Sequence, residues 1–394
     1  MGVRPPSPIP ATSPSYELLL KPSSSKPSLR IALLGSRGIP ARYGGYETFM
    51  EEIAGRLVAM GHDVTVYCRS HYTRHDETEH LGARLVVLPT LRTKYLDTPV
   101  HTLLSCLHAA RARYDVALVV NSANALFVPL VRWSGIPTAL HVDGIEKRRA
   151  KWGAVGRAVY ALSERLACWV PTVLLTDAEV IREHYQRRYG AESWMITYGV
   201  DPKPPETDDV LRRLGLTPGR YFLYVSRFEP ENNPDKLVDA YAGVDGDVPL
   251  VMVGDAPYAD DFIRGFKARA DTRVLFPGTI YGDGYRQLQS HALAYVQATE
   301  VGGTHPALVE AMGYGNCLLV NDAPENREVA GDTALYFDAR RPETLAAHMR
   351  WVLGHPDEVE ERRRASAERA RRFYSWNAVS ERYEQLFRHM TEHS

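Results

Sequence analysis

Apolar residues in this chain occur as short unbroken runs, separated by longer stretches in which apolar positions recur every three to four residues. The short runs are rich in β-branched residues and predict buried strands, whereas the longer stretches predict helices with one apolar face. In the first half of the chain the expected strands are residues 29–34, 63–68, 83–88, 116–120, 138–141 and 173–176. Expected helices include residues 46–60, 103–113 and 155–170.

The alternation pauses at three prolines within residues 202–205, which indicate an interdomain linker, and then resumes. Further strands are expected at residues 221–225, 250–253, 274–276, 294–297 and 317–320, and further helices at 234–242, 306–314 and 357–372. Strands that alternate with helices form parallel sheets covered on both faces. We therefore expect an α/β fold of two doubly wound, Rossmann-like domains facing each other, with ligands bound in the interdomain cleft at the carboxyl ends of the strands.

The expected domain limits follow from composition. Residues 1–28 are rich in Pro and Ser and predict a disordered tail. Residues 29–200 then form the N-terminal domain and residues 201–375 the C-terminal domain. A last helix, residues 376–394, is expected to pack back onto the N-terminal domain.

Length and charge narrow the class of protein. A chain of 394 residues suits two domains, and 47 Lys and Arg against 48 Asp and Glu argue against a dedicated nucleic-acid binder. The four cysteines lack metal-ligand or redox spacing and indicate a reducing compartment. Without an apolar run long enough to span a bilayer, the expected location is the cytoplasm. Peripheral contact with the inner face of the cell membrane stays open.

Several common motifs are missing from the sequence. It contains no G-x-x-x-x-G-K-[ST], G-x-G-x-x-G, H-E-x-x-H, G-x-S-x-G or C-x-x-C. Nucleotide hydrolysis by a P-loop, ordinary nicotinamide chemistry, zinc proteolysis and serine hydrolysis therefore lose support. We expect no bound metal.

Two candidate ligand-binding segments follow strands in the first half. Gly44 and Gly45 precede a helix, where bare backbone N–H groups and the helix N-terminus favour an anion, although an ordinary tight turn has the same pattern. His141 and Asp143 can act on an acceptor hydroxyl or hold a sugar; a structural histidine is the alternative. The basic residues 147–151 and Trp152 can contact an anionic membrane or a lipid diphosphate, or form a solvated loop.

The second half carries the stronger signals. Arg227 follows a strand, where a guanidinium can bind a diphosphate through two hydrogen bonds. Gly302, Gly303 and Thr304 precede Pro306 at a helix start, so backbone N–H groups are expected to face a phosphate. Glu310 lies one turn further and can accept both hydroxyls of a ribose.

The order of these motifs resembles that of family 4 glycosyltransferases, which have the GT-B fold, from about residue 29 to the C-terminus. Residues 35–40, 43–47, 230–233 and 302–306 are most similar to the subgroup of bacterial rhamnosyltransferases that build surface polysaccharides. Two departures stand out. Many members carry two glutamates separated by seven residues, but here Gly302 takes the first position and Glu300 lies two residues earlier. Many also carry a Lys shortly after the Arg, where this chain has Asn232 and Asn233.

The resemblance implies a role for each candidate residue. It places His141 beside the transferred sugar and Arg227 on the donor diphosphate as the catalytic candidates. The remaining roles are Gly44, Gly45, Gly303, Thr304 and His305 at the diphosphate, Ile280 at the base, Glu310 at the ribose, and Asp143 and Glu300 as weaker sugar contacts. The family is regarded as retaining, and no cofactor is expected besides the nucleotide sugar.

The expected function is transfer of a sugar from a nucleotide diphosphate donor to a hydroxyl of a lipid-linked or cell-surface glycan. The resemblance favours L-rhamnose carried by dTDP. Another hexose or a small-molecule acceptor remains an alternative. So do a sugar epimerase or phosphorylase of the same fold and a nucleotide-sugar-binding protein without transfer activity.

Overall fold

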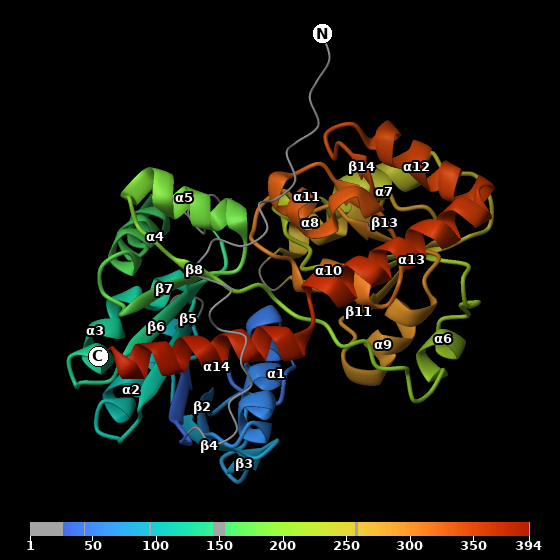
Figure 1. Ribbon diagram of the computed structural model, residues 1–394. Coiled ribbons are helices and arrows are strands. Elements are labelled where there is room, and N and C mark those ends of the chain that lie inside the picture. Colours follow the sequence, from blue (N-terminus) through green and yellow to red (C-terminus); the bar gives the residue numbers. More distant parts are fainter. Residues whose placement is uncertain (1–26, 43, 94–95, 145–153, 257–258, 394) are drawn as a thin grey trace.

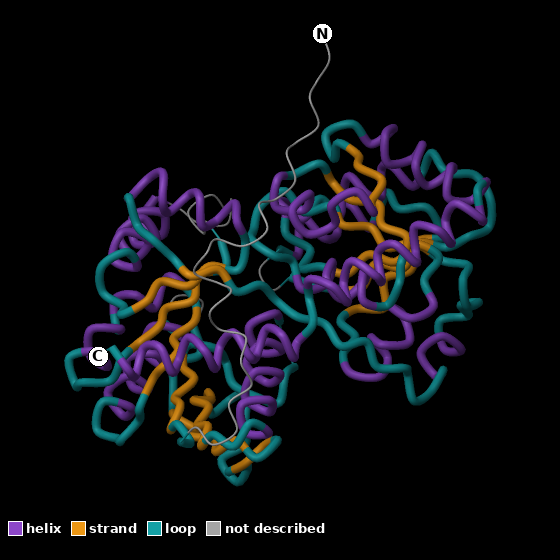
Figure 2. The backbone as a smooth tube through the Cα atoms, in the orientation of Figure 1, coloured by secondary structure: helices purple, strands orange, loops and turns teal. Residues whose placement is uncertain are grey.

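The computed structural model describes residues 27–393, apart from residues 43, 94–95, 145–153 and 257–258. The chain forms two halves side by side, each built around its own sheet (Figure 1). In each half the strands lie between layers of helices (Figure 2). The expected α/β fold of two doubly wound halves is confirmed. Nearly all of the expected tail and the whole basic segment 147–152 lie outside the described residues.

The first sheet has eight strands in the order β3-β4-β2-β1-β5-β6-β7-β8, and only β3 runs antiparallel to its neighbour. The strands are β1 (Arg30–Leu34), β2 (Asp63–Arg69), β3 (Glu79–His80), β4 (Ala83–Leu88), β5 (Val116–Val120), β6 (Thr138–Val142), β7 (Val173–Thr176) and β8 (Trp194–Met195). The helices of this half are α1 (Gly45–Ala59), α2 (Asp97–Ala109), the 3₁₀ helix η2 (Ser122–Leu126), α3 (Val128–Arg132), α4 (Ala154–Ala167) and α5 (Glu179–Tyr189).

The second sheet has six parallel strands in the order β11-β10-β9-β12-β13-β14. The strands are β9 (Phe222–Val225), β10 (Leu250–Val253), β11 (Val274–Gly278), β12 (Ala294–Gln297), β13 (Cys317–Asn321) and β14 (Ala334–Phe337). The helices of this half are α6 (Asp209–Arg213), η4 (Pro230–Asn232), α7 (Pro234–Tyr241), α8 (Asp260–Lys267), α9 (Gly282–His291), α10 (Pro306–Gly313), α11 (Pro324–Ala330), η5 (Gly331–Thr333), α12 (Pro342–Gly354) and α13 (Pro356–Phe373). A last helix, α14 (Trp376–Glu392), follows them in the chain.

The apolar runs form central strands because helices cover both of their faces. All five residues of β5 are buried, including both sets of alternating side chains. On α1 the side chains of Phe49, Ile53 and Leu57 enter the core at helical spacing, but Met60 is exposed because the helix has already ended. The expected helix 103–113 instead begins at Asp97 and ends at Ala109.

The last helix, α14, leaves the second half and lies across the first, beside α1 (Figure 1). Tyr383 and Phe387 of α14 are fully buried in the core that also contains β1 and α1. The chain thus crosses between the halves twice, and the two crossings touch. The N–H of Val200 donates to the carbonyl of Tyr374 at 2.5 Å. None of the helices in the described residues is both long and apolar enough to cross a bilayer.

Candidate active site

Two helix N-termini, one from each half, meet between the sheets. Gly45 begins α1 and Pro306 begins α10, and a Cβ added to Gly45 would lie only 3.0 Å from Cγ of Pro306. The N-terminal end of a helix carries a partial positive charge and N–H groups without helical partners. Their convergence therefore creates a position that favours an anion.

The loop before α1 is held by a buried carboxylate. Oε1 of Glu47, in the first turn of α1, accepts a hydrogen bond of 3.0 Å from the N–H of Arg37. Burial raises the pKa of Glu47, and the Arg37 N–H and guanidinium oppose that rise. Glu47 thus holds the loop that precedes the glycine pair, while Gly44 is the N-cap of α1 and is partly exposed.

The Gly302–Thr304 loop before α10 packs directly on the first half. A Cβ added to Gly303 would lie 2.5 Å from Oδ1 of Asp177 and 2.6 Å from the carbonyl oxygen of Asp143. Only a glycine permits this approach. Beside it, the ring of His305 folds over Gly302, since a Cβ there would lie 2.4 Å from the ring carbon Cε1.

Asp177, which directly follows β7, bonds the same loop. The Thr304 N–H donates to Oδ2 of Asp177 at 3.0 Å, and the Thr304 hydroxyl donates to the Asp177 carbonyl at 2.7 Å. Burial and the neighbouring Asp143 carboxylate raise the pKa of Asp177 well above its usual value. Thr304 was expected to bind phosphate, and in this structure a carboxylate takes that place.

The His141 ring is surrounded by aromatic side chains. Its ring packs within 6.4 Å, between ring centroids, of Tyr46, Phe49, Tyr198 and Tyr383. Burial lowers the pKa of His141 to about 3, so the imidazole is neutral at physiological pH. Such a histidine is a poor general base.

The hydrogen bonds of His141 indicate a different use. The Tyr383 hydroxyl lies 3.3 Å from Nδ1, an arrangement that suits the tautomer with its proton on Nε2. Nε2 is buried and has no hydrogen-bond partner among the described residues. The ring can therefore donate one hydrogen bond to a ligand without changing its charge.

Arg227 follows β9, with its side chain 44% exposed and one guanidinium nitrogen 3.7 Å from a Glu229 oxygen. Asn232 and Asn233, at the position where the family often has Lys, bond backbone instead. The Asn232 amide donates to the Arg227 carbonyl at 2.7 Å and the Asn233 amide to the Ala298 carbonyl at 2.8 Å. They fix the loop that carries Arg227 and add no positive charge.

Glu310 and Ile280 are linked through α9. The Tyr285 hydroxyl donates to Oε2 of Glu310 at 2.5 Å, and a Cβ added to Gly284 would lie 3.0 Å from the Ile280 side chain. Burial raises the pKa of Glu310 to about 7, although the Tyr285 hydrogen bond works in the opposite direction. A carboxylate and a partly buried aliphatic side chain on one scaffold suit a ribose and a base.

Comparisons with known proteins identify the family of this chain. Residues 44–198 match the family described as Glycosyl transferase 4-like domain, and residues 211–373 match Glycosyl transferases group 1. The chain belongs to the GT-B glycosyltransferases. D-rhamnosyltransferase WbpZ of Pseudomonas aeruginosa is 27% identical over 198 residues, which are 48% of this chain and 51% of WbpZ. This glycosyltransferase therefore aligns with about half the length of that relative.

Solved structures share the fold of this glycosyltransferase over almost its whole length. Sucrose-phosphate synthase from Thermosynechococcus elongatus has a TM-score of 0.78 at 19% identity, covering 93% of this chain and 100% of the other. Anabaena HepE in complex with UDP-glucose has a TM-score of 0.74 at 14% identity, covering 91% and 99%. WaaG, a glycosyltransferase involved in lipopolysaccharide biosynthesis, has a TM-score of 0.70 at 16% identity, covering 91% and 99%.

Three groups at the interface between the halves were missed by sequence reasoning. They are Asp177, Tyr383 and Glu328, whose carboxylate accepts hydrogen bonds from the first two N–H groups of α5 at 2.6 and 3.1 Å. Glu328 is 149 residues from Glu179, and Tyr383 is 242 from His141. No local pattern signals such contacts.

Glu231, also missed, borders the expected sugar position. Its carbonyl accepts a hydrogen bond of 3.0 Å from the N–H of Glu300, which places the two loops side by side. Both carboxylate oxygens of Glu231 are buried and lack hydrogen-bond partners among the described residues. Glu300 itself is partly buried, and its contact with a sugar stays a prediction.

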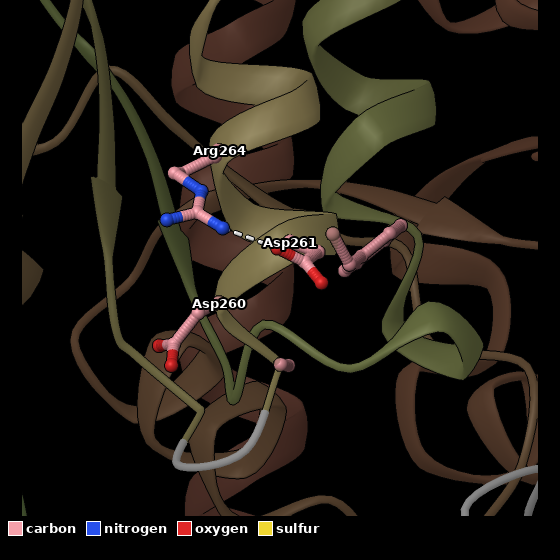
Figure 3. Close-up of a pocket in the computed structure, with 5 residues that line it drawn as sticks. Asp260, Asp261 and Arg264 are labelled. Carbon is pink, nitrogen blue, oxygen red and sulfur yellow. Dashed lines mark hydrogen bonds and ion pairs between the residues drawn. The ribbon is translucent and has the colours of Figure 1, made fainter.

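A surface hollow of about 430 Å³ at the start of α8 does not belong to this site (Figure 3). Residues 259–262 and Arg264 line it, and Arg264 forms an ion pair with Asp261. None of the expected site residues lines the hollow, and its two aspartates disfavour an anionic ligand.

Proposed function

We propose that this glycosyltransferase binds a nucleotide diphosphate sugar between its halves and transfers the sugar to a hydroxyl of a glycan acceptor. The observation that carries the proposal is the meeting of the N-termini of α1 and α10 at Gly45 and Pro306. A paired site of this kind suits a diphosphate. Arg227 follows β9 and adds a formal positive charge at the same edge of the second sheet, where the strands end.

The proposed role of these residues is to stabilise the diphosphate as it leaves the sugar. As the bond between sugar and phosphate breaks, negative charge grows on the leaving group. Arg227 and the two helix N-termini oppose that charge, and fixed groups of this kind lower the barrier without moving. Glu310 accepts the ribose hydroxyls, Ile280 contacts the base, and Nε2 of His141 donates to the sugar. In this proposal no metal is needed and the anomeric configuration is retained, as in the family the sequence resembles.

The hydrogen bond between Asp177 and Thr304 adds a step to the proposed donor binding. Its carboxylate occupies the Thr304 N–H that a phosphate would use. A donor diphosphate therefore replaces the Asp177 carboxyl group, whose pKa is raised, at the start of α10. Because Asp177 belongs to the first half and Thr304 to the second, this exchange couples donor binding to the contact between the halves.

L-rhamnose carried by dTDP is the proposed donor. Support comes from the motifs shared with rhamnosyltransferases of surface polysaccharides and from the partial match to WbpZ. HepE, which shares the fold, binds UDP-glucose, so a UDP-hexose is the principal competing donor. The proposed acceptor is a lipid-linked or cell-surface glycan. The proposed location of the enzyme is the inner face of the cell membrane.

Donor binding can be tested by thermal unfolding with a panel of nucleotide sugars. A ligand that binds only the folded state at about 100 times its Kd adds about 2.7 kcal/mol of stability. We expect dTDP-rhamnose to raise the midpoint for the wild type and to have little effect on Glu310→Gln. If no nucleotide sugar or nucleoside diphosphate shifts the midpoint, the proposal fails.

A binding protein without transfer activity is the second candidate. The uncompensated Glu231 carboxylate and the absent lysine favour it, since both weaken charge neutralisation at the diphosphate. Donor binding without release of nucleoside diphosphate in the presence of any lipid-linked acceptor would support this candidate instead.

A further inference from the structure

Glu231 is a buried acid of the second half whose charge is not compensated. It lies in the 3₁₀ helix η4 and is 9% exposed, and neither carboxylate oxygen has a hydrogen-bond partner among the described residues. Asp97 and Asp177 also have an unpartnered buried oxygen, but the second oxygen of each accepts a hydrogen bond. A buried carboxylate is costly unless hydrogen bonds or an opposite charge compensate it. The two unpartnered oxygens of Glu231 therefore need an explanation.

The backbone around Glu231 is fixed by hydrogen bonds from several sides. Its carbonyl accepts a hydrogen bond of 3.0 Å from the Glu300 N–H. The Tyr224 hydroxyl donates to the Asn232 carbonyl at 2.8 Å, and the Asn232 amide donates to the Arg227 carbonyl at 2.7 Å. These contacts hold the carboxylate in place before any ligand arrives. A group held in this way loses little conformational freedom when it binds.

Glu231 lies beside the groups proposed to hold the donor. It is four residues after Arg227, on the loop that follows β9. Glu300 follows β12, which is the strand paired with β9, and the same loop continues to Gly302 and the start of α10. A sugar attached to a diphosphate at Arg227 and the N-terminus of α10 is therefore expected next to these two loops.

The carboxylate of Glu231 suits a neutral ligand with two donors. A carboxylate with both oxygens unpartnered can accept two hydrogen bonds at once, and adjacent hydroxyls of a sugar supply such a pair. A phosphate fits poorly because it carries the same sign of charge. A divalent cation fits poorly as well, because the described residues contain no group of three or more His, Cys, Asp or Glu side chains that could hold one.

We propose that Glu231 binds two adjacent hydroxyls of the transferred sugar and thereby determines which donors are accepted. The inference rests on the proposed function, because it assigns a residue to the sugar of the same donor. A bare nucleoside diphosphate leaves the carboxylate unpaired, whereas a nucleotide sugar supplies the missing hydrogen bonds. Both oxygens are covered in this structure, so the sugar reaches them as the contact between the halves changes on donor binding.

Calorimetric titration of the full chain separates the contribution of the sugar from that of the nucleotide. The probes are dTDP-rhamnose with dTDP, UDP-glucose with UDP, and GDP-mannose with GDP. Within each pair, the Kd of the nucleoside diphosphate divided by that of the nucleotide sugar measures what the sugar adds. For the pair that binds the wild type most tightly, Glu231→Gln should lower this ratio about tenfold, because hydrogen bonds to a charged group are lost.

The nucleoside diphosphate alone distinguishes a sugar contact from a structural role. It should bind Glu231→Gln at least as tightly as the wild type, because the variant removes a negative charge near the diphosphate. A residue that only shaped the loop would weaken the binding of both probes when replaced. The control is Glu368→Gln, which replaces an exposed acid on α13 and should leave both values of Kd unchanged.

Thermal unfolding without ligand gives a second readout. Glu231→Gln keeps the shape of the side chain and removes a buried charge that has no partner, so its midpoint should equal or exceed that of the wild type. A carboxylate needed for the fold would give the opposite result.

Three results would overturn the proposal. An unchanged Kd ratio in Glu231→Gln would mean that other groups hold the sugar, and donor binding by the wild type would leave the proposed function standing. Equal weakening of both probes, or a lower thermal midpoint for Glu231→Gln, would make Glu231 a structural residue of its loop. If no probe binds the wild type, the proposed function and this inference fail together.

Discussion

The charge of Glu310 depends on its surroundings. Its pKa of about 7 means that the carboxyl changes charge within the physiological range, through burial beside Tyr285. The Arg227 side chain, by contrast, is 44% exposed. The proposed donor site therefore combines an exposed guanidinium with an acid that can hold or lose a proton.

The charge of Glu310 predicts how donor affinity varies with pH. The ionised carboxylate is a stronger acceptor for both ribose hydroxyls than the neutral acid, so Kd for the donor should fall as pH rises from 6 to 8. Glu310→Gln should weaken binding about 10- to 100-fold and flatten the dependence, because hydrogen bonds to a charged group are lost. Calorimetric titration at several pH values measures the donor Kd and its dependence on pH. The control is Glu368→Gln, which replaces an exposed acid on α13.

The same raised pKa lowers stability at high pH. Between the ordinary value near 4.5 and about 7, the folded state holds the Glu310 proton more tightly than the unfolded state does, so the free energy of unfolding falls as pH rises. The Glu310→Gln variant has no ionisable group at this position, so its free energy of unfolding does not show this fall. The thermal midpoint of the variant should rise relative to that of the wild type between pH 5 and pH 8. If the difference between the two midpoints does not change with pH, Glu310 is not buried as described.

Arg227→Ala should lower kcat/KM for the donor about 10- to 100-fold, because a charge-assisted hydrogen bond to the diphosphate contributes about 1.5–3 kcal/mol. Arg264→Ala, which removes an exposed arginine from α8 in the same half, should leave the rate unchanged. Equal rates for the two variants would remove Arg227 from the site.

At the scale of elements, the loop before α10 is one of the places where the two halves touch closely. Its glycines are needed for that approach, and its Thr304 N–H is held by Asp177. This contact makes the start of α10 respond both to the donor and to the position of the first half.

Gly303→Ala should reduce transfer more than tenfold, because its Cβ would lie 2.6 Å from the Asp143 carbonyl and so keep the halves apart. Gly265→Ala in α8 is the matched control, since a Cβ there meets nothing within 4 Å. Steady-state rates and the thermal midpoint should be taken together: a fully active Gly303→Ala would contradict the close contact.

Asp177→Asn tests the exchange of carboxylate for phosphate. The variant keeps the shape of the side chain and can carry no charge, so at a pH where Asp177 is ionised the donor should bind the variant about three- to tenfold more tightly than the wild type. Asp332→Asn, at an exposed position, should change nothing. Weaker donor binding to Asp177→Asn would mean that the carboxylate supports the donor site instead of competing with phosphate.

At the scale of the whole molecule, α14 ties the end of the chain to the first half. It brings Tyr383 to His141 and buries Phe387 in the core around β1. Phe387→Ala should cost about 3–5 kcal/mol of stability, as for other large buried rings, and should lower transfer by loosening the Tyr383 contact. Phe373→Ala should change stability by less than about 0.5 kcal/mol. Denaturant unfolding followed by fluorescence distinguishes the two.

The fold was largely predictable because its central strands are continuous apolar runs. The all-buried β5 and β10 could be read directly from the sequence, whereas two-residue β3 and β8 could not, because they exist only through pairing with a neighbour. Arg227 and Glu310 stand in recognisable local patterns. Asp177 and Tyr383 do not, since each reaches the site from a distant part of the chain.

Release of nucleoside diphosphate is the most direct test of the central claim. The purified chain is incubated with dTDP-rhamnose and a panel of other nucleotide sugars, with and without lipid-linked acceptors, and nucleoside diphosphate is measured by chromatography. We predict that one nucleotide sugar is consumed in step with glycan product, and that Arg227→Ala slows this while Arg264→Ala does not. No release from any nucleotide sugar by the folded wild type would contradict the claim.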